Sequence, residues 1–150
     1  MKIETLLLCD SAQVANGKLF ILGGGWTLYR AANYPTNIQI GLAVDVSFNR
    51  TEAGVKFPLK VSIADEAGIP IIPAMDGQIE AGQPAQEVPK GALLKLPLAI
   101  NTALQLPRPG RYTIVMSVGS SKVQTSFEAI FVGTKVELAI PPEGEVERGH

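Results

Sequence analysis

Apolar and polar residues alternate along several long segments of this chain. The clearest is 38–48, in which every second residue from Ile38 to Phe48 is apolar. A period of two is typical of a β-strand that places one face on a hydrophobic core and the other toward solvent. The pattern therefore predicts a β-strand at 38–48. Similar alternation predicts further strands at 55–63, 94–100, 112–118 and 123–131.

The stretch CDSAQVANGKLFILGGGW, residues 9–26, predicts a β-hairpin followed by a bend. Asn16-Gly17 lies between two apolar segments, and both residues tolerate the positive φ angles of a tight two-residue turn. The three glycines that precede Trp26 allow the backbone to bend without a side-chain clash. We therefore expect strands at 3–8 and 18–22, a loop at 10–13 and a turn at 16–17.

Proline, glycine and aspartate place the remaining turns. Pro58 lacks a backbone N–H, so the strand at 55–63 is predicted to lie at a sheet edge or to carry a bulge. Asp76-Gly77 predicts a turn, and 27–37 predicts a loop that crosses between strands. Gly119-Ser120 predicts that the last two strands form an antiparallel hairpin.

The spacing of these signals predicts the fold class. No long segment carries apolar residues at the i, i+3, i+4, i+7 spacing of an amphipathic helix. About eight or nine strands separated by turns predict an all-β protein, an antiparallel β-sandwich with a Greek-key, immunoglobulin-like or C2-like arrangement. A flattened barrel is the alternative. We assign residues 1–133 to a single domain, and residues 134–150 to a short extra strand followed by a disordered acidic tail.

The composition indicates a surface that is partly apolar. Hydrophobic residues make up 46% of the chain and charged residues 18%, against roughly 25% charged residues in ordinary soluble domains. Some apolar surface is therefore expected to meet another subunit or a protein partner. The net charge is -1 and the 13 Lys and Arg residues are scattered, so the chain lacks the basic stripe that binds nucleic acid phosphates.

Neither secretion nor membrane insertion is indicated. The apolar run from Leu6 to Leu8 falls far short of the roughly 7 to 15 apolar residues of a signal peptide core. No segment reaches the roughly 20 apolar residues of a membrane helix. Cys9 is the only cysteine, so the chain cannot form an internal disulfide. These observations predict a cytoplasmic protein.

Residue types that carry catalysis or bind metals are scarce. The only histidine, His150, is the last residue, so Cys9 has no evident base beside it. A transition-metal site would need several Cys or His ligands. We therefore predict no catalytic residue, no metal site and no cofactor, and hence no enzyme. The nearest approach to an acidic cluster is Asp65, Glu66, Asp76 and Glu80, whose spacing fits turns better than a calcium loop.

The segment GWTLYRAANYP, residues 25–35, is rich in aromatic residues. Aromatic and arginine side chains are enriched in recognition surfaces, so Trp26, Tyr29, Arg30 and Tyr34 are the predicted binding residues. A structural role is the favoured alternative, in which the rings cap the open end of the core and Arg30 covers them.

Tyr112 lies where the segment PRPGR enters a predicted strand. A tyrosine at such a corner often donates its hydroxyl to nearby backbone and fixes the connection between strands. We predict this structural role for Tyr112.

Several motifs resemble those of a known family. They are CDSAQVxNGKLFILGGGW near the N-terminus, then DEAGIP, EAGQP, LPLAIN and LPRPGRY. Between Thr5 and Phe131 the chain resembles an uncharacterised bacterial family of small proteins that share a domain of unknown function. The resemblance implies a cytoplasmic bacterial protein with no assigned activity, substrate or cofactor, so it transfers no catalytic residue.

Taken together, these features predict a non-enzymatic interaction module. We expect the β-sandwich to bind a protein partner or to form a homo-oligomer through an apolar sheet face or an edge strand. The alternative is a small-molecule or carbohydrate binder that uses the segment Trp26–Tyr34.

Overall fold

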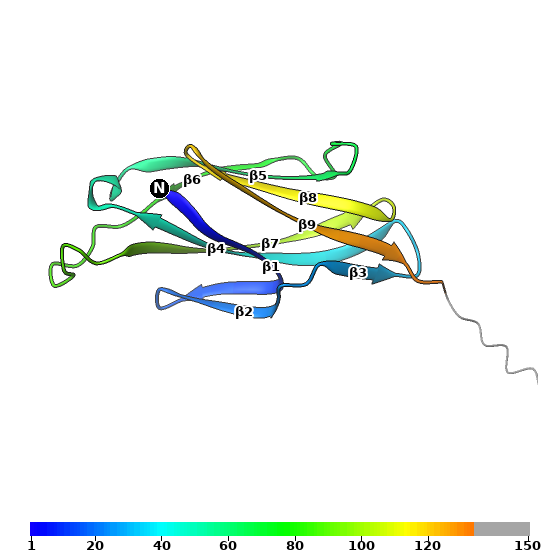
Figure 1. Cartoon of the computed structure of the whole chain (residues 1–150), viewed down its shortest axis with the longest axis horizontal. Helices are drawn as coiled ribbons and strands as arrows, with labels where there is room; N and C mark the ends of the chain where they lie inside the picture. Colours follow the sequence, from blue (N-terminus) through cyan, green and yellow to red (C-terminus); the bar gives the residue numbers. More distant parts are fainter. Residues whose placement is uncertain (134–150) are drawn as a thin grey trace, which may run out of the picture.

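The computed structural model describes residues 1–133, which form two β-sheets packed face to face (Figure 1). One sheet has the strand order β2-β1-β4-β7, and the other has the order β3-β9-β8-β5-β6. The predicted all-β sandwich is confirmed, and the barrel alternative is wrong because the two sheets share no strand. The predicted extra strand and acidic tail, residues 134–150, lie outside the described residues. The strands are β1 (Lys2–Ala15), β2 (Lys18–Gly24), β3 (Leu28–Ala31), β4 (Thr36–Phe48), β5 (Lys56–Asp65), β6 (Met75–Glu80), β7 (Leu94–Leu106), β8 (Gly110–Val118) and β9 (Ser121–Phe131).

The hydrophobic core lies between the two sheets, and β4 and β8 supply its longest runs of buried residues. Every second residue of β4 from Ile38 to Val46 is buried, as is every second residue of β8 from Tyr112 to Val118. Both strands are internal, with β1 and β7 flanking β4 and with β5 and β9 flanking β8. The alternation at 38–48 and 112–118 therefore predicted the core correctly.

The segment 27–37 contains a strand that the sequence did not predict. Within it, β3 pairs with β9 in parallel, whereas every other strand pair of the described chain is antiparallel. The predicted antiparallel arrangement therefore has one exception, the parallel pair of β3 and β9. Four residues are too few to display a periodicity, so β3 was indistinguishable from the loop around it.

Two predictions from turn-forming residues are wrong. Asp76-Gly77 lies inside β6, where it pairs with Leu59 and Lys60. The strand that contains Pro58 is neither an edge strand nor bulged, because β5 lies between β8 and β6 and pairs with both without a register shift. Proline is tolerated there because β8 pairs with β5 only from Leu59 onward, so the missing N–H breaks no bond to β8.

Tyr112 makes the corner that the sequence predicted. Its hydroxyl donates to the carbonyl oxygen of Arg108, whose N–H donates back to the phenol oxygen at 3.3 Å. The ring is buried and stacks on Phe127 with the ring centroids 5.5 Å apart. Beside it, the buried carboxylate of Asp65 pairs with the guanidinium of Arg108. These contacts fix the connection between β7 and β8 to the end of β5.

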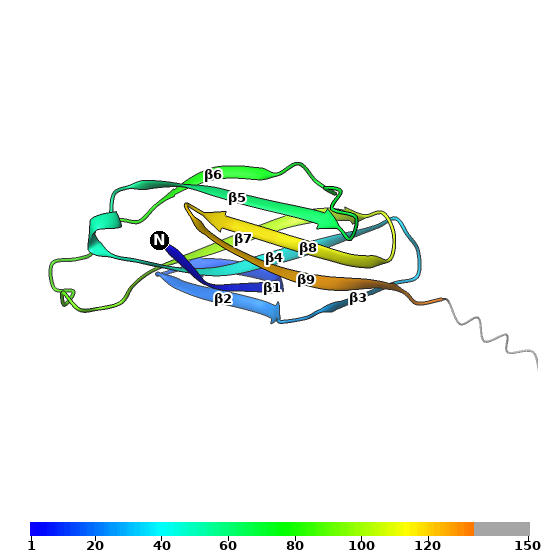
Figure 2. The same cartoon turned by 45° about the horizontal axis from the view of Figure 1, so that its top comes forward.

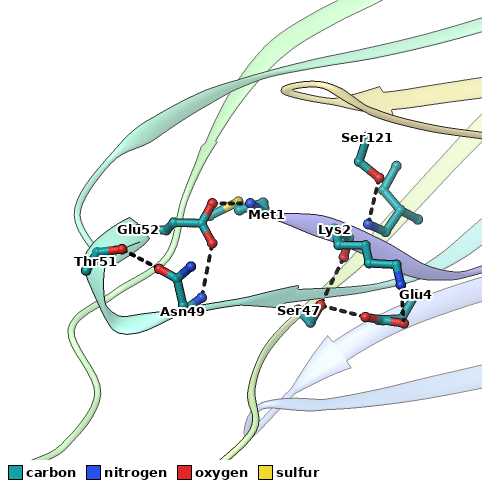
Figure 3. Close-up of polar contacts among 9 residues, drawn as sticks. Met1, Lys2, Glu4, Ser47, Asn49, Thr51, Glu52 and Ser121 are labelled. Atoms are coloured by element: carbon teal, nitrogen blue, oxygen red, sulfur yellow. Dashed lines mark hydrogen bonds and ion pairs between the residues drawn. The ribbon is translucent and has the colours of Figure 1, made fainter.

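Within residues 1–133 the only helix is a single 3-10 turn, Arg50–Glu52, which is far too short to cross a membrane. Figure 3 shows that its Glu52 carboxylate pairs with the amine of Met1 and also accepts the N–H of Asn49 at 3.1 Å. The contact with the amine, and secondly that with Asn49, lower the pKa of Glu52. The start of β1 is thereby held against the connection from β4 to β5.

This ion pair predicts a loss of stability in acid. Because the folded state lowers the pKa of Glu52, the pair contributes fully above the carboxyl's unfolded pKa and is lost as the pH falls through its folded pKa. At pH 7 the Glu52→Gln variant should lose up to about 1 kcal/mol in free energy of unfolding. At pH 3 its difference from wild type should shrink. Urea unfolding at both pH values measures this, with the exposed Glu87→Gln as the control; an equal loss at both pH values would contradict it.

Candidate functional site

The first strand folds back over its own sheet. The first half of β1 pairs with β4 up to Cys9↔Gly41, and the second half pairs only with β2. Figures 1 and 2 show β1 turning back near its middle, so that its second half and β2 form a hairpin that lies against the sheet. We call this hairpin, residues 10–24, the arm. The loop predicted at 10–13 is therefore wrong, because those residues continue as strand.

Gly41 permits the close passage of the arm over the sheet. A Cβ atom at position 41 would lie only 2.9 Å from the Cα atom of Ser11 and from the Sγ atom of Cys9. The fully buried Cys9 packs there with Ala12 and Ala43. Burial, and secondly the charge of Asp10, raise the pKa of the Cys9 thiol, which therefore stays protonated at neutral pH. The geometry gives Cys9 a packing role beneath the arm.

The side chain of Asn101, on β7, holds the arm in place. Its Nδ2 atom donates to the carbonyl oxygen of Ala12 at 2.8 Å, and its Oδ1 atom accepts the N–H of Ala12 at 3.0 Å. The amide thus bonds both backbone groups of one arm residue, as a neighbouring strand would. This satisfies polar groups that the fold-back would otherwise leave buried without partners.

The arm exposes large apolar side chains. Leu19 packs on the cluster of Cys9, Ala12 and Ala43, so this face of the arm is directed toward the sheet. Phe20 and Leu22 alternate with it and point away from the sheet, and they are 56% and 70% exposed. Within the described residues β2 has β1 on one side and no strand on the other. The arm therefore presents both an apolar face and an open strand edge.

The open hairpin edge follows from the turn geometry. Asn16 and Gly17 have φ angles of 51° and 70°, and Ala15 pairs with Lys18 across them, which confirms the predicted tight turn. The residues that flank such a turn form a hydrogen-bonded pair, after which bonded and non-bonded pairs alternate. Leu19, Ile21 and Gly23 therefore direct their backbone N–H and C=O groups to the open side of β2.

Of the four predicted binding residues, three pack against the core and one, Arg30, is exposed. Trp26 packs edge-on against Phe127, with ring centroids 5.3 Å apart. The ring centroids of Tyr29 and Trp26 are 6.5 Å apart. The Tyr34 hydroxyl donates to the carbonyl oxygen of Ile130 at 2.7 Å, and burial raises the pKa of that hydroxyl. These three rings pack against the core. Arg30 is exposed on β3.

A groove of about 400 Å³ runs beside Trp26. Trp26, Tyr29 and Leu28 line it together with the base of the arm and the first half of β4, which β1 has left unpaired. Asp10 and Gln39 contribute polar side chains, while Arg30 and Tyr34 are not among its lining residues. Within residues 1–133 the buried indole N–H of Trp26 has no hydrogen-bond partner. The groove combines aromatic rings with polar side chains.

The acidic residues considered for calcium are not brought together. Asp65 lies at the end of β5, where its carboxylate accepts the N–H groups of Ala67 and Ile69 at 3.0 and 2.9 Å. Asp76 lies further back along the same strand pair, opposite Lys60. Among the described residues no three His, Cys, Asp or Glu side chains form a cluster that could hold a metal ion. The turn role predicted for Asp65 is confirmed.

The sequence offered one unused signal for the arm. Ala12 and Val14 alternate with Ser11 and Gln13 as in a strand, but Asp10 and Ser11 suggested a loop. The role of Asn101 had no local signal, because its partner Ala12 lies 89 residues away. Only the folded chain brings the two together.

The fold and the site define a β-sandwich with an apolar, folded-back arm. Residues 4–127 match the model of a family of unknown function (DUF6941), and the chain belongs to this family. The predicted resemblance to an uncharacterised family is thereby confirmed. A search among curated proteins gave no match.

The two hydrogen bonds between Asn101 and Ala12 predict that mutation of Asn101 affects the arm. Asn101→Leu removes two hydrogen bonds and should lower the free energy of unfolding by about 1–3 kcal/mol. Amide hydrogen exchange should rise at least tenfold in residues 10–24. Mass spectrometry of exchanged peptides measures this, with Gln105→Leu on the same strand as the control. Equal exchange in the arm of both variants would show that Asn101 does not hold it.

Proposed function

We propose that this protein is a non-enzymatic interaction module that binds a partner through the arm. The observation that carries the proposal is the strand β2, which is open along one edge and exposes Phe20 and Leu22 on its outward face. Burying such a side chain in an interface contributes about 1.5–3 kcal/mol. An exposed apolar strand edge is a template for pairing with another chain.

A comparison of the four sheet edges supports this assignment. Natural β-proteins protect their edges with proline, charged residues or very short strands. The edge strand β7 contains Pro97 and Lys95, β6 contains charged residues, and β3 has only four residues. The segment β2, KLFILGG, has one charge at the end next to the turn and no proline. It is the unprotected edge among the described strands.

The residue types of the chain support the non-enzymatic part of the proposal. The single cysteine is buried beneath the arm, and the single histidine is residue 150, outside the described part. The fold itself is compatible with many functions, so the assignment depends on the arm and not on the sandwich.

The proposal predicts that charges on the arm abolish partner binding. The double variant Phe20→Lys, Leu22→Lys should bind its partner more than tenfold more weakly, because two buried apolar side chains are replaced by solvated ones. Affinity capture from an extract of the source cells, quantified by mass spectrometry, measures this. The matched control is Ile69→Lys, Leu93→Lys, which changes two equally exposed apolar residues outside the arm. Partners retained by the arm variant would contradict the proposal.

The groove beside Trp26 favours a second candidate function, the binding of a small molecule or carbohydrate. Sites for small ligands combine apolar and aromatic walls with a few converging polar groups, as Trp26, Tyr29, Asp10 and Gln39 do here.

Trp26 is the only tryptophan, so its fluorescence reports directly on the groove. Titration with mono- and disaccharides should give a saturable change in Trp26 emission if this candidate is correct. The Gln39→Ala variant should weaken the response, while Tyr34→Phe, outside the groove, should keep it. Emission that is unchanged by every sugar would remove this candidate.

A further inference from the structure

The open edge of β2 matches a second copy of itself. We propose that the partner of the arm is the same strand of another molecule, paired antiparallel about a two-fold axis at Ile21. This inference rests on the proposed function and names the partner of the same surface. The two four-stranded sheets would join into one continuous sheet across the β2 strands.

The first argument is hydrogen bonding. An antiparallel pair centred on Ile21 places Leu19 opposite Gly23 of the second copy and Ile21 opposite Ile21. These are the residues whose backbone groups face the open edge of β2. Each therefore meets a partner that also faces outward, which a register shifted by one residue, with the axis midway between two residues, would not allow. Hydrogen bonding therefore requires the axis to pass through a residue, and the side chains decide which residue.

The second argument is side-chain packing. The same register places Phe20 opposite Leu22 of the second copy, and Leu22 opposite Phe20. These positions form non-hydrogen-bonded pairs, in which side chains approach most closely. Both residues lie on the outward face of the arm, where nothing in the described chain covers them. The pairing therefore covers the two most exposed apolar side chains of β2 with each other.

The third argument is charge. Lys18 is the only charged residue of β2. In the proposed register it lies opposite Gly24, and the two Lys18 side chains are separated by six residues of strand, or roughly 20 Å. A parallel, in-register pair would instead place the two Lys18 side chains next to each other, where their positive charges repel. Charge thus favours the antiparallel arrangement.

Other occupants of the edge fit less well. A strand from a different protein would use the backbone edge but would need its own apolar residues at the spacing of Phe20 and Leu22. A second copy supplies that spacing by identity, and two-fold symmetry uses each contact twice. Because one strand pair is a small interface, we expect association in the micromolar range.

Disulfide trapping tests both the partner and the register. The native Cys9 is buried, so cysteines introduced on the arm are the reactive ones. Phe20→Cys and Leu22→Cys proteins, distinguished by mass, are mixed under mild oxidation. The mixed pair places the two cysteine Cα atoms about 4.5 Å apart, within the range for a disulfide. In this mixed dimer Leu22 of the Phe20→Cys protein still lies opposite Phe20 of the Leu22→Cys protein.

A disulfide-linked heterodimer should form in the mixture at least tenfold faster than either variant links to itself. In each variant alone the two cysteines lie diagonally, roughly 8 Å apart, which is too far for a disulfide. Equal linkage in the single variants would overturn the register. Sedimentation of wild type against Phe20→Lys, Leu22→Lys gives the association directly.

The outcomes separate this inference from the proposed function. If wild type stays monomeric at high micromolar concentration while the arm still captures another protein, the second copy is not the partner and the interaction module stands. If wild type dimerises without heterodimer linkage and irrespective of the lysine substitutions, the interface lies elsewhere. If the arm variants neither dimerise less nor lose a captured partner, both the inference and the proposed function fail.

Discussion

The close crossing of β1 over its own sheet is the constraint on which the arm depends. At Gly41 the backbone of Ser11 passes where any larger residue would place its Cβ atom. Dispersion and burial in this small cluster act only because Cys9, Ala12 and Ala43 are small enough to let two layers approach. At the crossing, the N–H and C=O groups of Ala12 do not pair with a neighbouring strand. The side-chain amide of Asn101 forms hydrogen bonds with both groups instead. Close packing and polar satisfaction therefore act at the same place.

This crossing also explains how one strand produces two surfaces. Because β1 leaves β4 after Cys9, the first half of β4 loses a neighbour and borders the groove beside Trp26. The departing half of β1 carries β2 away from the body of the sheet and presents its edge outward. The groove and the open edge are thus two consequences of one change of direction. The remaining sheet edges are short or carry proline and charged residues, which leaves β2 as the edge with the strongest tendency to pair.

The aromatic residues contribute more to the core than to the surface. Trp26, Tyr29 and Tyr34 pack against the core between the sheets, where Trp26 meets Phe127. Tyr112 stacks on the same phenylalanine and bonds the backbone at its corner. The hydroxyls of Tyr34 and Tyr112 donate to backbone carbonyl oxygens, whereas the indole N–H of Trp26 has no partner within the described residues. An aromatic-rich segment can therefore serve the core even where its composition resembles a binding surface.

The sequence by itself determined the local features of this protein. Alternation in β4 and β8 identified core strands, because a period of two directly reflects which face is buried. Asn16-Gly17 identified the first turn, because the two residues tolerate the positive φ angles that it needs. Tyr112 identified the corner before β8, because its hydroxyl bonds backbone only four residues away. Only the tertiary structure decided the parallel pairing of β3, the central position of Pro58 and the fold-back of β1. Those features depend on contacts such as Ala12 with Asn101, whose residues lie far apart in the chain and carry no signal of each other until it folds.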